Sequence, residues 1–77
     1  MCTDLNLPIP GRSEYLVPGV KVKLHRFDNT IWIVCFGWYA WGGNRKVCGW
    51  YLVDTSNPDK LKPLQDTDII DIYMIDR

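Results

Sequence analysis

The tripeptide Gly-Trp-Tyr occurs twice in this chain, at residues 37–39 and again at residues 49–51. Between the two copies lies Gly42-Gly43-Asn44, a combination that favours the tight turn of a β-hairpin because these residues tolerate positive φ. The repeat and the turn therefore predict two antiparallel strands that carry three of the four tryptophans on one β-ribbon.

A two-residue turn at Gly43-Asn44 would set the pairing of these strands. Trp50 would then lie opposite Gly37, and Trp38 opposite Gly49, so that each indole covers a glycine of the neighbouring strand. A glycine in the middle of a strand also favours a bend or a close approach of two backbones. The repeated tripeptide thus has a structural explanation.

The rest of the chain is punctuated by turn residues and alternating apolar positions. Val20, Val22 and Leu24 alternate with Lys21, Lys23 and His25, which is typical of a half-buried strand. The predicted strands are 20–25, 31–41, 45–53, 60–64 and 70–75, with a single helical turn at 65–68 and Asp66 as its N-cap. Residues 1–17 are expected to form an extended N-terminal arm, because prolines interrupt them, and residues 18–77 a small β-barrel domain.

This order of elements, with Gly19-Val20-Lys21-Val22 at the start of the first strand, resembles the SH3-like small β-barrels over residues 18–76. The resemblance implies an all-β fold, an SH3-like small barrel of about five antiparallel strands with one short helical turn before the last strand. An OB-type barrel is the alternative. The acidic loop and paired aromatics with which eukaryotic SH3 domains hold proline-rich peptides have no match here, and such barrels serve many functions.

The cysteines are Cys2, Cys35 and Cys48, an odd number without a C-x-x-C motif. In the predicted pairing Cys35 faces Leu52 and Cys48 faces Tyr39, which separates the two cysteines by about 13 Å along the ribbon. A disulfide needs Cα atoms within about 7 Å. We therefore expect free thiols and, even with His25 as a fourth ligand, no metal site and no cofactor.

Composition bears on the compartment and on the partners. No apolar run approaches the ~20 residues of a membrane span, and the first 19 residues lack the features of a secretory signal. These features predict a cytoplasmic protein, and the short chain suits an accessory protein of a bacterium or phage. The formal net charge of zero argues against a protein devoted to phosphate backbones or membrane surfaces.

Catalysis has little support in the sequence. His25 is the single histidine and is expected on an exposed strand face, while Ser13 and Ser56 fall in loops. The carboxylates Asp66, Asp68 and Asp71 surround the predicted helical turn, where capping and solvation explain them better than acid–base chemistry. The protein is therefore predicted not to be an enzyme.

Binding is better supported, because the chain holds more large rings than so small a barrel can bury. Trp32, Tyr39 and Trp41 are expected to remain exposed, beside Arg45 and Lys46 in the loop at 42–46. Exposed aromatic patches with arginine commonly anchor protein interfaces. The leading hypothesis is therefore a contact with a protein partner or, in a homo-oligomer, with a second copy.

Two other ligand classes stay open. Lys21, Lys23, Lys60 and Lys62 would form a basic strip if the first and fourth strands lie close, and single-stranded nucleic acid could bind there. The same lysines would also serve to block edge-to-edge strand pairing. Exposed rings could instead hold cell-wall or sugar ligands, as in bacterial SH3 domains.

Overall fold

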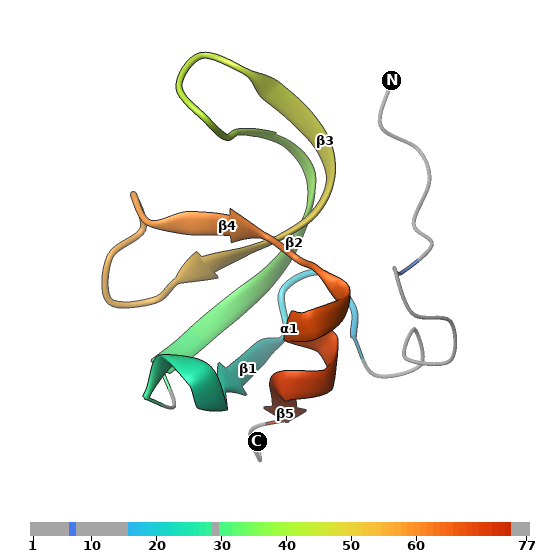
Figure 1. Ribbon diagram of the computed structural model, residues 1–77, viewed down its shortest axis with the longest axis vertical. Helices are drawn as coiled ribbons and strands as arrows, with labels where there is room; N and C mark the ends of the chain where they lie inside the picture. Colours follow the sequence, from blue (N-terminus) through green and yellow to red (C-terminus); the bar gives the residue numbers. More distant parts are fainter. Residues whose placement is uncertain (1–6, 8–15, 29, 75–77) are drawn as a thin grey trace.

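The computed structural model describes Leu7, residues 16–28 and residues 30–74. Its elements in chain order are β1 (Lys21–Leu24), the 3₁₀ turn η1 (His25–Phe27), β2 (Thr30–Ala40), β3 (Lys46–Asp54), β4 (Leu61–Pro63), α1 (Asp66–Asp71) and β5 (Ile72–Met74). The tip of the β2–β3 hairpin and the strand β5 lie at opposite ends of the longest axis (Figure 1).

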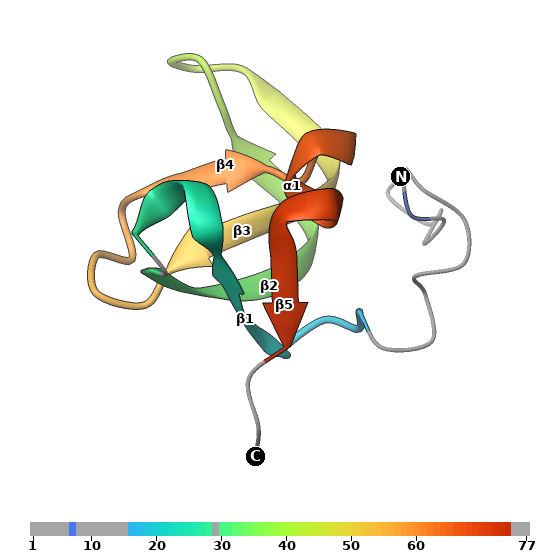
Figure 2. The same cartoon turned by 60° about the horizontal axis from the view of Figure 1, so that its bottom comes forward.

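The strands form one antiparallel sheet in the order β4-β3-β2-β1-β5. The prediction of an all-β fold with a short helix before the last strand is confirmed. No pairing within the described residues joins β4 to β5, so the sheet is open there and its closure into a barrel stays a prediction. Figure 2 shows β5 running beside β1.

One face of the sheet and the inner side of α1 form the core. Val22 and Leu24 on β1 are buried as their alternation predicts, since inward positions of a strand recur every second residue. The other buried members of this cluster are Leu7, Leu16, Trp32, Val34, Trp50, Leu52, Leu64, Ile69 and Ile72. The predicted N-terminal arm thus reaches the core through Leu7 and Leu16, and its other residues before Leu16 lie outside the described part.

The pairing of β2 with β3 differs from the prediction by one residue. Ala40 pairs with Lys46, and the N–H of Trp41 donates to the carbonyl oxygen of Arg45 at 2.9 Å, which leaves a three-residue loop instead of a two-residue turn. Gly37 therefore lies opposite Gly49, and neither tryptophan covers a glycine. The predicted glycine–indole pairs are wrong because one extra loop residue shifts every partner.

The two facing glycines mark a bend of the hairpin. Gly37 has φ 150° and Gly49 has φ 151°, a region of backbone conformation that is essentially reserved for glycine. Figure 1 shows β2 and β3 curving together, so that the outer half of the hairpin turns away from the rest of the sheet. The bend expected at Gly37 is confirmed, and Gly49 is its unforeseen counterpart.

A buried carboxylate ties α1 to the sheet. Asp68 is fully buried, and its Oδ1 lies 2.5 Å from Nη2 of Arg26 while its Oδ2 pairs with Nζ of Lys62. The same Oδ2 accepts the backbone N–H of Gln65 at 3.0 Å, and Gln65, not Asp66, is the N-cap. Asp68 thus caps the helix as expected, but it is not solvated, because two cations from η1 and β4 replace water around it.

The prediction for the cysteines is correct for Cys35 and wrong for Cys48. Cys35 is a free thiol, whereas Cys48 is disulfide-bonded to a partner outside the described residues. An odd number of cysteines leaves one unpaired thiol but does not prevent a pair. Because disulfides persist mainly in oxidising compartments, the disulfide at Cys48 does not favour the predicted cytoplasmic location.

Candidate functional site

The end of the β2–β3 hairpin beyond the two glycines, residues 38–46, is the most unusual surface of the described structure, and we call it the hairpin end. Before the bend, Trp32, Val34 and Trp50 point into the core from one face of the ribbon. Trp38 lies on that same face by register, yet it is 56% exposed because the bend carries it off the core. Trp41, at the start of the loop, is 46% exposed.

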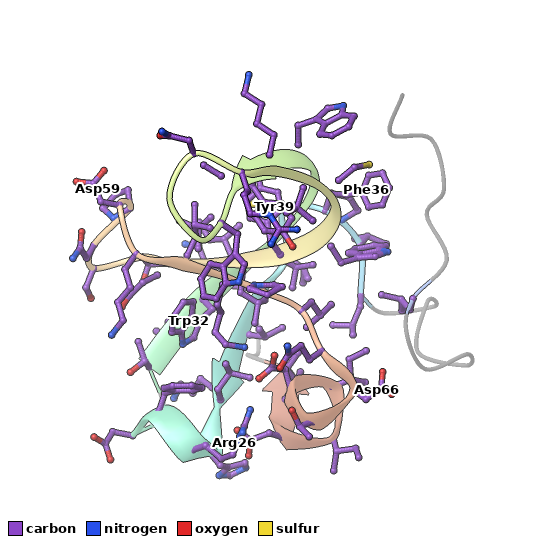
Figure 3. The ribbon with its side chains drawn as sticks, turned by 45° about the horizontal axis from the view of Figure 1, so that its top comes forward. Arg26, Trp32, Phe36, Tyr39, Asp59 and Asp66 are labelled. Atoms are coloured by element: carbon purple, nitrogen blue, oxygen red, sulfur yellow. The ribbon has the colours of Figure 1, made fainter. Side chains whose placement is uncertain are left out.

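On the opposite face of the ribbon, the side chains on the two sides of the bend pack against each other. Tyr39 and Tyr51 lie on either side of the glycine pair, and their rings stack with centroids 4.5 Å apart. Figure 3 shows Tyr39 inside the curve of the hairpin and Phe36 outside it. Burial raises the pKa of both phenols, and a contact with Cys35 raises that of Tyr51 further. This face is therefore a packed support for the exposed one.

A hollow of about 500 Å³ opens at the hairpin end and is lined, among the described residues, by Trp38, Tyr39, Ala40 and Lys46. Trp38 pairs with Cys48 and Ala40 with Lys46, so Trp38 and Lys46 are diagonal neighbours across the two strands. Cβ atoms in such a pair lie about 7 Å apart. The hollow therefore combines an indole, a phenol, the methyl group of an alanine and an ammonium group.

The charge at the hairpin end is of one sign. Arg45 and Lys46 are exposed, and neither forms an ion pair within the described residues. Between Asp28 and Asp54 the sequence contains no Asp or Glu. This surface can therefore accept a carboxylate or another anion without having to displace an internal partner.

Two of the residues expected to be exposed are core residues. Trp32 is 1% exposed and contacts Phe27 edge to face, and Tyr39 is 8% exposed in its stack with Tyr51. Both were expected to be exposed because they lie near turn ends, but Trp32 is on the face that packs against the core and the bend brings Tyr39 onto Tyr51. Of the predicted site residues, the structure brings Trp41, Arg45 and Lys46 together at the hairpin end.

Trp38 is the residue that the sequence prediction missed. The signal was present, because the glycines of the two tripeptides stand symmetrically about Gly43. A three-residue loop centred on Gly43 makes them face each other and creates the bend that exposes Trp38.

Two lysines of the predicted basic strip, Lys21 and Lys62, lie on different faces of the sheet. Lys62 lies on the core side of the sheet opposite Leu52, where it pairs with Asp68, whereas Lys21 projects from the other face. In the sheet order, β2 and β3 separate β1 from β4. The strip was predicted from two segments assumed to be neighbours, and Lys62 is already engaged by a buried carboxylate.

The remaining candidates for chemistry are dispersed. His25 is exposed, in η1 instead of on a strand, and Ser56 lies in the loop after β3. Burial raises the pKa of the Cys35 thiol, although a hydrogen bond with Tyr51 partly offsets this. Within the described ranges, no group of three His, Cys, Asp or Glu side chains could hold a metal ion.

No helix in the part of the chain that the structure describes is both long and apolar enough to cross a membrane. No family model, no curated protein and no solved structure matches this chain.

Proposed function

We propose that the protein is a non-catalytic binding module, built on an SH3-like small barrel, that contacts another protein or a second copy of itself through the hairpin end. The observation that carries the proposal is the exposure of Trp38 and Trp41 beside Arg45 and Lys46, two cations that form no ion pair within the described residues. Tryptophan and arginine are the residues that most often dominate the binding energy of protein interfaces.

The support beneath this surface favours the same function. The glycine bend and the Tyr39–Tyr51 stack hold the hairpin end in one shape, so that little conformational freedom is lost on binding. Leaving two indoles in water costs solvation free energy, and a bound protein would remove that cost.

For the SH3-like architecture, the support is the order of the elements and the long bent second strand. The helical turn between β4 and β5 is a further point of agreement. Closure would require β4 and β5 to approach each other at the open edges.

The proposal is tested by a comparison of variants. The immobilised protein and its Trp38→Ala, Trp41→Ala and Val17→Ala variants are exposed to a lysate of the producing cells that also contains a tagged copy of the chain. Val17 is a suitable control because it is 51% exposed but lies before β1.

We expect the proteins retained by the unchanged chain and by Val17→Ala to be lost from both tryptophan variants. Circular dichroism should show that all four proteins are folded. Equal retention by the tryptophan variants, or no protein retained above a blank support, would contradict the proposed function.

A further inference from the structure

We propose that the protein bound at the hairpin end is a second copy of this chain, which presents the outer side of α1. This inference rests on the proposed function and names the partner. It starts from the second large apolar group that the fold leaves exposed. Ile70 is 72% exposed, more than any other large hydrophobic side chain among those described.

The outer side of α1 carries the charge that the hairpin end lacks. Asp66 and Ile70 are four residues apart on the helix and both are exposed, so they are neighbours on one face. Figure 3 shows Asp66 on one side of the helix and Arg26 on the other. Arg26 and Lys62 pair with the buried Asp68, which leaves Asp66 without an ion pair within the described residues.

The two surfaces also match in spacing. The Cβ atoms of residues four apart on a helix are about 5–6 Å apart. The diagonal pair Trp38 and Lys46 is separated by only slightly more. Ile70 of one copy can therefore rest on the indole and in the hollow while Asp66 meets the ammonium group of Lys46.

Different surfaces on the two copies make the contact heterologous. The hairpin end and α1 lie on different sides of the molecule, so one copy can use both surfaces at once (Figures 1 and 2). Repetition then gives a ring if the rotation closes and an open chain if it does not. Because the contact includes an ion pair between exposed residues, Asp66 and Lys46, association should rise with protein concentration and fall with salt.

Paired charge reversals test this contact. Lys46→Glu and Asp66→Lys each place like charges in the contact, and we expect each variant alone to raise the dissociation constant about tenfold or more. In an equal mixture, the unchanged surface of one variant can meet the unchanged surface of the other. The two reversed surfaces also carry opposite charges, so both orientations of the contact are restored. Lys60→Glu and Asp59→Lys are matched controls in the loop between β3 and β4.

The measurement is the molar mass from light scattering over a concentration series, without reductant so that the disulfide at Cys48 persists. A non-reducing gel excludes covalent dimers. We expect the mass of the unchanged chain and of the controls to rise with concentration, that of each reversal variant to rise only at about tenfold higher concentration or more, and that of their mixture to rise as it does for the unchanged chain.

A monomeric unchanged chain at every concentration would overturn the second-copy contact. Association of each reversal variant over the same concentration range as the unchanged chain, or a mixture that associates no better than either variant alone, would do the same. None of these results would overturn the proposed function, because the retention of other proteins by the hairpin end is measured separately. The recovery of association in the mixture also guards against variants that merely fail to fold.

Discussion

Tyr39 and Tyr51, the last residues of the two Gly-Trp-Tyr copies, stack on each other across the pair formed by Gly37 and Gly49. Their ring planes are inclined by 30°, and the residues between them on that face have no side chains. The two copies therefore meet as a unit in which glycine faces glycine and tyrosine covers tyrosine. The tryptophans of the two copies therefore differ in burial: Trp50 lies in the core and Trp38 is exposed on the surface.

The glycine pair should resist substitution even though it has space around it. A Cβ at Gly37 would have no atom within 4 Å, but φ of 150° is strained for any L side chain. We expect Gly37→Ala to lower the free energy of unfolding by about 1–3 kcal/mol in chemical denaturation.

The reverse substitution on the same strand, Ala40→Gly, is the control and should also destabilise, by about 0.5–1 kcal/mol. Stabilisation by Gly37→Ala would show that the strand simply prefers alanine and that the bend is not built on glycine.

Alkaline pH should lower the stability of the protein, because Tyr39 and Tyr51 lose their phenol protons. Burial raises the pKa of Tyr39 and Tyr51 above 10.0, so the folded state holds the phenol protons more tightly than the unfolded chain. Their contribution to stability is complete below the unfolded value and is lost as the pH rises through the folded value. We expect the free energy of unfolding to fall above about pH 10, and to fall less steeply in Tyr39→Phe. If the free energy of unfolding falls with pH at the same slope in the unchanged chain and in Tyr39→Phe, ionisation of Tyr39 does not cause the loss.

The two halves of the ribbon, before and beyond the glycine bend, should respond differently to loss of an indole. Trp32 lies in the core, so Trp32→Ala should cost about 3–5 kcal/mol of stability in urea denaturation. Trp38→Ala removes an exposed ring and should leave the denaturation midpoint nearly unchanged. If Trp38→Ala unfolds the domain, its ring is structural and the hairpin end is not a free surface.

Asp68 and Asp66 provide a matched comparison on one helix. Asp68→Asn leaves Lys62 and Arg26 without their shared carboxylate, and we expect it to lower the free energy of unfolding by about 3 kcal/mol. The loss should not be larger, because the half-exposed Arg26 regains contact with water. Asp66→Asn, at an exposed position, should unfold at the same denaturant concentration as the unchanged chain. Equal effects of the two changes would show that burial of Asp68 contributes nothing.

The sequence was a good guide wherever local periodicity decides the structure. The strands, the buried face of β1 and the helix before β5 follow from alternation and turn residues. The site was harder to predict, because the exposure of Trp38 depends on a single loop residue that fixes the register and on a bend produced by two glycines distant in sequence. The burial of Asp68 depends on Arg26 and Lys62, which only the tertiary fold brings together.

The most direct test of the hairpin end as a contact surface is site-specific photo-cross-linking. A benzophenone side chain replaces Trp41 in one protein and Val17, which is slightly more exposed, in another, and each is irradiated in the lysate with a tagged copy of the chain present. We predict protein adducts from position 41 and none from position 17. Adducts from neither position, or equally from both, would contradict the account.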